Sequence, residues 1–233
     1  MHTIMKSCCN ETVHFLINYI KRKVMDVMKN TIITIGRQFG SGGHEIAKAV
    51  ADALSIPFYD KEIIIEAAKK SGLNENLFKN SDERTVSSFL YSVALGTYSP
   101  VNSMAGIPMM TMNETIFQTQ AEVIREFAAK GSCIFVGRCA DYILEDNPDC
   151  RKIYIYADMP YRIERIQKLY NLDAAKAEST IIKTDKKRAN FYNYYTGKKW
   201  NAVENYDLCV NSGKLGITGT VELILSYLRL QEV

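Results

Sequence analysis

The sequence predicts an α/β fold in which a parallel sheet is covered by helices on both faces. Five short apolar runs of strand length recur along the chain, and a helical pattern follows each of them. Strands that are buried on both faces read as near-continuous apolar runs, as these do. The 233 residues are 47% hydrophobic and 24% charged, which suits one such domain with insertions.

The first strand, Thr31–Gly36, leads into a loop that has almost no side chains. Residues 40–43 read Gly-Ser-Gly-Gly, and Glu45–Leu54 then has the apolar spacing of an amphipathic helix. Such a loop leaves backbone N–H groups at a helix N-terminus, where the helix dipole also favours an anion. We therefore predict that a phosphate binds to a loop made of Gly40, Ser41, Gly42, Gly43, His44 and Glu45.

Two known phosphate-binding motifs match this loop only in part. The dinucleotide fingerprint lacks its third glycine, although Asp60 lies where a ribose-binding acid would stand. In the Walker A pattern, aligning the second glycine with Gly42 puts Arg37 at the first glycine, Gly43 at the lysine and His44 at the hydroxyl. A nicotinamide-dependent oxidoreductase therefore stays open as an alternative to phosphate transfer.

The remaining elements follow in order along the chain. We expect strands at Ile56–Tyr59, Cys133–Val136, Lys152–Ala157 and Tyr206–Asn211, and helices at Lys61–Lys70, Asn113–Lys130, Cys139–Glu145, Met159–Tyr170, Leu172–Asn193 and Ile217–Leu230. Residues 61–130 form a long insertion between the second and third strands. Val13–Met28 is amphipathic, but it is too short and too charged for a membrane span. We expect residues 1–29 to be a helical extension of a domain at 30–233.

Three stretches of the chain resemble the cytidylate-kinase-like family, a branch of the P-loop nucleoside monophosphate kinases. They are residues 33–64, 134–144 and 185–200, and the glycine loop without a lysine is typical of that branch. The resemblance implies a three-layer P-loop kinase fold whose five-stranded parallel sheet has the order 2-3-1-4-5. It places acceptor binding in 61–130 and a lid in 159–200. It also implies ATP-dependent phosphorylation of a nucleoside monophosphate or a related small acceptor, with Mg²⁺ carried by the substrate phosphates.

Phosphoryl transfer depends on cationic groups that hold two phosphates in line and neutralise their charge. The candidate catalytic residues are Arg37, Arg138, Arg162, Arg165, Lys187 and Arg188. The candidate acceptor-binding residues are Asp60, Lys61, Arg138 and Asp185. Other readings stay open: the basic run at 183–188 also fits a solvated helix face, and Arg138 also fits a buried ion pair. The aromatic tract Phe191–Tyr195, with Trp200, either stacks on a base or packs against the core.

Composition narrows the class of protein. A net charge of +3 does not indicate a nucleic-acid binder, and six cysteines without a Cys-x-x-Cys pair fit reduced thiols in a cytosol. We expect a cytoplasmic protein without a metal site of its own or a membrane span, whose partners are a nucleotide and a small acceptor. Because Gly43 replaces the lysine, a nucleotide-sensing module that has lost transfer is a further alternative. The identity of the acceptor and the oligomeric state stay open.

Overall fold

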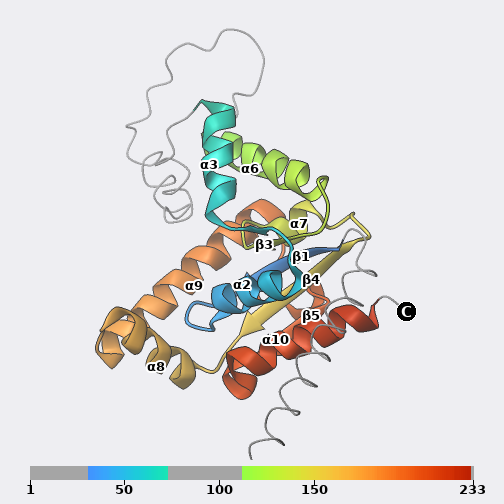
Figure 1. Ribbon diagram of the computed structural model, residues 1–233. Helices are drawn as coiled ribbons and strands as arrows, with labels where there is room; N and C mark the ends of the chain where they lie inside the picture. The colour runs from blue at the N-terminus through green and yellow to red at the C-terminus, as the bar shows by residue number, and fades with distance from the viewer. Residues whose placement is uncertain (1–30, 73–111, 232–233) are drawn as a thin grey trace, which may run out of the picture.

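The computed structural model describes residues 31–72 and 112–231 (Figure 1). Five strands in this part of the chain form one parallel sheet of order β2-β3-β1-β4-β5. The strands are β1 (Ile32–Arg37), β2 (Phe58–Tyr59), β3 (Cys133–Val136), β4 (Cys150–Tyr156) and β5 (Leu208–Asn211). The expected α/β class and the sheet order 2-3-1-4-5 are confirmed.

Helices cover both faces of the sheet, which gives three layers. On one face α2 (Gly43–Leu54) and α10 (Ser212–Leu230) pack against Ile33 and Ile35 of β1. On the other face α3 (Lys61–Ser71), α6 (Met112–Ala128) and α7 (Ala140–Ile143) pack around Ile32 and Phe135. The alternation of side chains along β1 supplies both cores, and this explains the unbroken apolar run in the sequence.

The central position of β1 determines where a site can form. Its residue Ile35 pairs with Val136 of β3 on one side and with Ile153 of β4 on the other. The carboxyl ends of these strands therefore meet at one edge of the sheet, where open α/β sheets bind ligands. In the dinucleotide fold the second strand lies beside the first, whereas β2 here pairs with β3. The sheet order thus disfavours the nicotinamide-dependent alternative.

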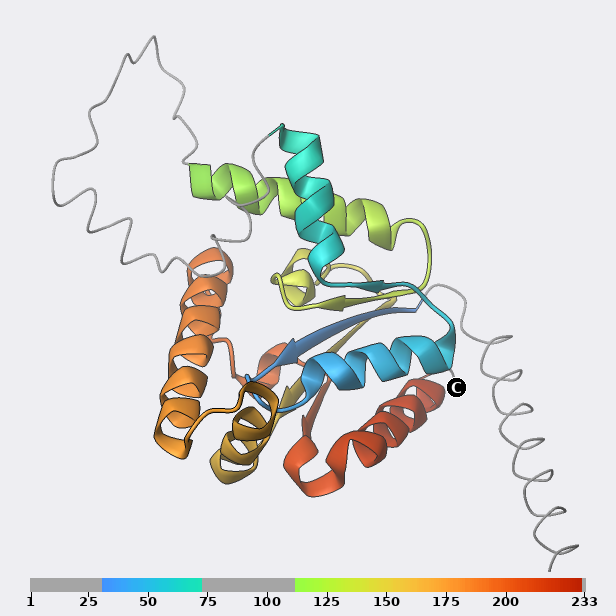
Figure 2. The ribbon, with the colours of Figure 1, turned by 60° about the vertical axis from the view of Figure 1, so that its left-hand side comes forward.

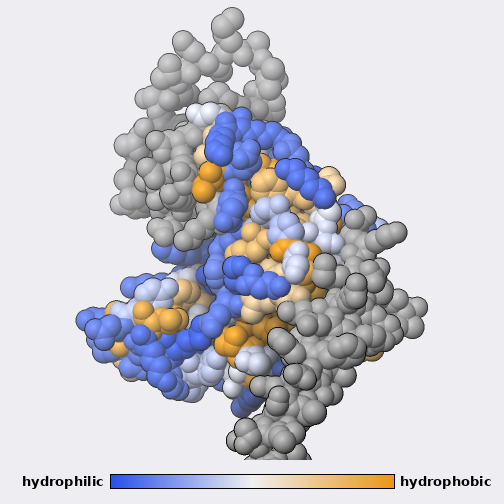
Figure 3. Space-filling model, viewed as in Figure 1, coloured by the Kyte–Doolittle hydropathy of each residue, from blue (hydrophilic) through white to orange (hydrophobic). Residues whose placement is uncertain are grey.

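The two helices that follow β4 form a helical hairpin beside this edge (Figure 2). It consists of α8 (Met159–Tyr170) and α9 (Ala174–Thr196), and Asp173 caps α9 by accepting a hydrogen bond from the N–H of Lys176 at 2.8 Å. The hairpin has a small core of its own, into which Phe39 of the glycine loop also packs. Hydrophilic side chains cover much of its visible surface (Figure 3).

Several boundaries differ from the expected ones, each for a local reason. Helix α2 begins at Gly43 rather than Glu45, because Gly42 turns the chain with φ of 79°. Helix α10 begins at Ser212 rather than Ile217, because the Asn211 side chain caps an extra turn before a kink at Gly216. Strand β5 begins at Leu208, two residues later than expected, after the 3-10 turn η1 (Val203–Asn205).

The aromatic tract packs against the core. Tyr192 and Trp200 are buried in a cluster with Tyr154 and Tyr206. Tyr195 stacks on Phe117 of α6 with ring centroids 4.1 Å apart. These packed rings stabilise the attachment of α9 to the sheet, whereas Tyr194 of the same tract is exposed.

Parts of the expected organisation lie outside the described residues. These are the extension at 1–29 and the middle of the insertion, residues 73–111. Among the described helices, none has the length and apolar character needed to cross a bilayer.

A buried pair links α7 to α9 and allows a test of this packing. The Tyr192 hydroxyl donates to the Asp141 carboxylate at 2.7 Å. Burial raises the pKa of Asp141, and this hydrogen bond opposes the rise. Tyr192→Phe should therefore cost about 1–3 kcal/mol in urea unfolding at pH 7. Because the variant's carboxyl pKa rises further, its deficit should grow as pH increases from about 4 to 7.

The matched control is Tyr194→Phe, since Tyr194 is exposed and lies two residues away on the same helix. It should change the unfolding free energy by less than about 0.5 kcal/mol. Equal effects of the two substitutions would contradict a stabilising role for the buried hydrogen bond.

Candidate functional site: a glycine loop and a cluster of arginines

The glycine loop joins β1 to α2 at the carboxyl edge of the sheet. Gly40 and Gly42 have φ of 82° and 79°, a region that favours glycine. Gly42 is the N-cap of α2 and offers no side chain, so the first turn directs its backbone N–H groups toward the loop. The loop therefore has the local geometry of an anion site at a helix N-terminus.

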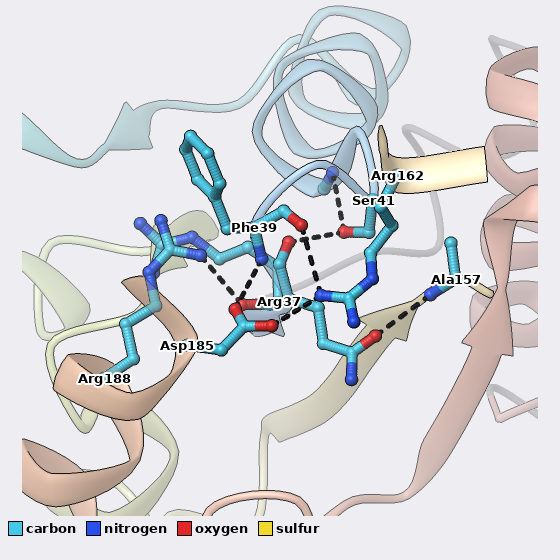
Figure 4. A network of polar contacts seen from close by, with 9 residues as sticks. Arg37, Phe39, Ser41, Ala157, Arg162, Asp185 and Arg188 are labelled. Carbon is cyan, nitrogen blue, oxygen red and sulfur yellow. Dashed lines mark hydrogen bonds and ion pairs between the residues drawn. The ribbon is translucent and has the colours of Figure 1, made fainter. Parts of the chain in front are cut away.

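Hydrogen bonds fix this loop from inside. The Ser41 hydroxyl donates to the carbonyl of Gln38 at 2.8 Å and accepts from the N–H of Gly43 at 3.3 Å. The Ser212 hydroxyl donates to the Ser41 carbonyl at 2.6 Å, and Gln38 Oε1 accepts from the N–H of Ala157 at 3.2 Å. Ser41 and Ser212 are fully buried, so the loop is held to the ends of β4 and β5. Figure 4 shows Ser41 and Ala157 within this network.

The side chain of Arg37 follows the floor of the loop instead of turning to solvent. A Cβ placed on Gly43 would lie 2.5 Å from Arg37 Cβ, and one on Gly137 would lie 1.9 Å from Arg37 Nη1. Arg37 therefore extends from the end of β1, past the start of α2, to the residue that follows β3. Only glycines leave room for it at both places.

Three guanidinium groups share this edge of the sheet. Burial and the charge of Arg37 lower the pKa of Arg188 to about 9. Burial also lowers the pKa of Arg138 to about 10, against an opposing effect of Asp60, and lowers that of Arg37. All three groups remain charged at pH 7, and Asp60 is a nearby carboxylate that partly offsets them. Such an excess of half-buried positive charge suits an anion with several oxygens.

The backbone around Arg138 is itself unusual. Arg138 and Cys139 have φ of 59° and 55°, so two consecutive residues with side chains adopt the left-handed region. Strain of this kind is stored mainly at functional sites. The turn follows Gly137 and brings the Arg138 side chain back toward Arg37.

Asp60 and His44 lie on the side of the site formed by β2 and α2. His44 Nε2 is 3.3 Å from the Asp60 carboxylate, and its ring lies edge-on to Phe58. Asp60 precedes α3 but does not cap it with its side chain, so the carboxylate faces the site. Lys61 is the first residue of α3, and its side chain lies outside the described part of the chain.

The expected lid residues are divided among different partners. Arg165 forms an ion pair with Glu45 over the mouth of the loop. Arg162 forms an ion pair with Asp185 at 2.5 Å, and Arg188 Nη1 donates to the Arg37 carbonyl at 3.1 Å. Lys187, next to Arg188 on α9, makes no ion pair with a described residue. The hairpin thus brings Arg188 into the arginine cluster, whereas Arg162 and Arg165 are engaged elsewhere.

Sequence reasoning missed three contributors to the site. Gln38, Phe39 and Ser212 fix the loop, and Ser212 lies 171 residues from its partner Ser41. The position of Ser212 directly after the last strand was an available signal, because that strand also ends at the ligand-binding edge. In the described residues no cluster of three His, Cys, Asp or Glu side chains could hold a metal ion.

A parallel sheet of order 2-3-1-4-5 with a glycine loop after its central strand defines the P-loop kinase class. The profile of the cytidylate kinase-like family matches residues 32–214. The chain belongs to the cytidylate kinase-like family.

Individual relatives agree with this assignment. The chain is 25% identical to a cytidylate kinase from Archaeoglobus fulgidus over 205 residues, which are 86% of this chain and 96% of that protein. It is 32% identical to a cytidylate kinase from Staphylothermus marinus over 104 residues, 44% of this chain and only 58% of that protein's length. A solved structure of an uncharacterized protein from Eubacterium ventriosum is 30% identical, with a TM-score of 0.63, and the match covers 84% of this chain and 97% of that one.

Anion binding at this site is testable with inorganic sulfate. We expect sulfate to raise the Tm of the parent protein in the manner of a ligand that binds only the folded state. Sulfate keeps its charge between pH 6 and 8, and the lowered pKa values of Arg138 and Arg188 stay above this range. The Tm increase should therefore be constant from pH 6 to 8, whereas binding by an imidazolium would fade as pH rises through about 6.5.

Gly42→Val should abolish this Tm increase, because a Cβ on Gly42 would lie 2.4 Å from Ile217 and the residue has positive φ. The matched control is Gly197→Val, since Gly197 also has positive φ but nothing lies within 4 Å of its Cβ position. A variant at Gly42 that still responds to sulfate as the control does would exclude the loop as the anion site.

Proposed function

We propose that this protein is an ATP-dependent phosphotransferase that acts on a nucleoside monophosphate, cytidylate-like, or on a related small phosphorylated acceptor. Membership of the cytidylate kinase-like family, the loop at the end of β1 and the arginine cluster support this proposal. The observation that carries it is the path of Arg37 along the floor of the loop. A guanidinium there can supply the charge that a Walker A lysine supplies in other P-loop proteins.

The parts of the site divide between donor and acceptor. The backbone N–H groups of residues 40–45 would hold the phosphates of ATP, with Arg37 beneath them. Arg138 and Asp60, with Lys61, would contact the acceptor, which approaches from the insertion at 61–130. Arg188 lies between the two and would stabilise the charge that develops on the transferred group. Lys187, and Arg165 after leaving Glu45, would add charge from the hairpin once the nucleotide is bound.

Magnesium fits this arrangement as a companion of the nucleotide. Mg²⁺ prefers oxygen ligands and commonly binds through substrate phosphates and one or two carboxylates. Asp60 is the carboxylate available on the floor of the site, and the nearby guanidiniums argue against a protein-built cage. The ion would neutralise phosphate charge, while the chain's own residues orient the two phosphates in line.

The second candidate is a nucleotide-sensing module that binds ATP without transferring its phosphate. Gly43 favours it, because the lysine of the Walker A pattern is missing. A direct assay separates the two: ADP release from ATP with CMP, dCMP, UMP and AMP as acceptors, each with identification of the phosphorylated product. Equimolar ADP and nucleoside diphosphate support the enzyme, whereas tight ATP binding without any product supports the sensor.

The role of Arg37 gives a sharper prediction. Arg37→Ala should raise the activation free energy by about 3 kcal/mol, which lowers kcat/KM by more than about 100-fold, as expected for the loss of one preorganised charge-stabilising donor. Arg37→Lys should recover part of this, since the charge survives without the fork. If both variants transferred phosphate like the parent, Arg37 would have no role in catalysis, and the sensing-module proposal would be strengthened.

Gly43 provides a complementary exchange. Gly43→Lys in the parent should reduce activity, because the new side chain would collide with Arg37. In an Arg37→Gly background, which also removes the Arg37 Cβ that would lie 2.5 Å from the new Cβ, the same substitution should raise activity, because it supplies the missing charge where space has opened. The control is Gly43→Ala in both backgrounds, which adds a Cβ without a charge. If lysine and alanine behaved alike in the Arg37→Gly background, the proposed equivalence of Arg37 and the Walker lysine would be wrong.

A further inference from the structure

We propose that Asp185 is a positioning residue that fastens the α8–α9 hairpin to the glycine loop, so that Arg188 is in place before a nucleotide arrives. The inference rests on the proposed phosphotransfer for its effect on turnover. Its geometric part concerns the protein without ligand and is testable separately.

The polar contacts join the two elements at a single residue of the loop. Asp185 Oδ1 accepts a hydrogen bond from the N–H of Phe39 at 2.8 Å, and Asp185 Oδ2 pairs with Arg162 Nη1 at 2.5 Å. The same Arg162 nitrogen donates to the carbonyl of Phe39 at 3.3 Å. The peptide groups on both sides of Phe39 are therefore bound by one ion pair from the hairpin (Figure 4).

Burial makes this contact costly to break, because the loss of one partner would leave the other charge buried alone. The Arg162 and Asp185 side chains are 7% and 18% exposed, so the pair is poorly screened by water. Both carboxylate oxygens of Asp185 are engaged within the protein. We therefore assign Asp185 to the loop, in place of the acceptor-binding role expected from the sequence.

Apolar contacts reinforce the same attachment. The Phe39 ring packs into the hairpin core beside Ile163 and Ile166. A Cβ on Gly40 would lie 3.1 Å from both Arg162 Cβ and Ile166 Cγ1, so the loop backbone lies directly against α8. The hairpin and the loop thus form one packed unit at this point.

The consequence for the site lies one turn further along α9. Arg188 is three residues after Asp185, so both side chains lie on the same side of the helix. Its Nη1 donates to the Arg37 carbonyl at 3.1 Å, and its guanidinium carbon lies 5.6 Å from the centre of the Phe39 ring. Asp185 therefore sets the position of the helix turn from which Arg188 reaches the site.

Amide hydrogen exchange of the ligand-free protein tests the attachment itself. Asp185→Ala should speed exchange at Phe39 by about 10-fold or more, because its N–H loses its acceptor and the loop opens more easily. Asp185→Asn should have a smaller effect at this amide, since one oxygen remains to accept. The control is Glu178→Gln, which removes an exposed carboxylate two turns earlier on α9 and should leave exchange at Phe39 unchanged.

Steady-state kinetics test the positioning role. A 1 Å shift of a preorganised group can cost about 100-fold in rate, so Asp185→Ala should lower kcat by about that factor with little change in the KM for ATP. The single variant leaves a buried arginine without its partner, and so we pair it with Arg162→Met/Asp185→Leu. This double variant should recover the parent's Tm but keep the low kcat, because neither side chain then binds the Phe39 backbone.

The outcomes separate this inference from the proposed function. Unchanged exchange at Phe39 in Asp185→Ala overturns the attachment, whatever the activity. Recovery of both Tm and kcat in the double variant also overturns it, since the pair would then serve stability alone. If the parent transfers no phosphate to any acceptor while exchange responds as expected, the proposed function fails and the attachment stands.

Discussion

The path of one half-buried side chain, that of Arg37, constrains the whole ligand-binding edge of the sheet. A charged group removed from water is costly unless other groups solvate it. Here the path of Arg37 requires glycine at 43 and 137. A side chain at residue 43, in the first turn of α2, or at residue 137, after β3, would occupy the space that Arg37 fills. The identity of two residues far apart in sequence, Gly43 and Gly137, thus follows from one side chain.

The neighbouring charges extend this constraint to the rest of the site. Arg138 comes from the turn after β3 and Arg188 from α9, and their lowered pKa values reflect burial first, with Arg37 as a further cause. Asp60 and Asp185 oppose the repulsion, but Asp185 is already paired with Arg162, and the two carboxylates do not balance the cations. In the ligand-free protein the cluster therefore carries a free-energy cost that an anion relieves, so folding stability and ligand binding are coupled. A site with this excess of positive charge favours anionic ligands over neutral ligands of the same shape.

Much of the fold could be predicted from the sequence, because its strongest signals are local. The apolar strands and the long helices have clear periodicity, and the resemblance supplied the sheet order. Boundaries failed where a cap or a turn decided them, as at Gly43 and Ser212, since a single φ angle or a capping side chain outweighs the apolar pattern. The residue types of the glycine loop were enough to predict a phosphate site. The direction of the Arg37 side chain was not predictable, because it depends on tertiary contacts.

Contacts across long sequence separations were beyond local reasoning. Asp185 and Phe39 are 146 residues apart. Because Asp185 is an acidic residue within a basic helical run, its sequence context predicts a ligand-binding group. The pattern around it was consistent with a solvated face, and nothing in the run indicates that a loop peptide binds there. The link between the two segments is visible only in the folded structure, where Phe39 packs into the hairpin and its backbone binds Asp185 and Arg162.

The loop without a lysine illustrates how a charge can be supplied from a different direction. A Walker A lysine rises from the first turn of the helix and reaches the phosphates on a flexible stem. Arg37 instead comes from the end of the central strand, and its stem is enclosed by Gly43 and Gly137. Enclosure removes most of the rotamer freedom that a lysine loses on binding, so less entropy opposes the contact with phosphate. The planar fork also offers two parallel donors, whereas an ammonium offers a point charge. The glycine loop therefore has a fixed guanidinium donor in place of a flexible lysine. This arrangement requires glycine at residue 43, because any side chain there would collide with Arg37.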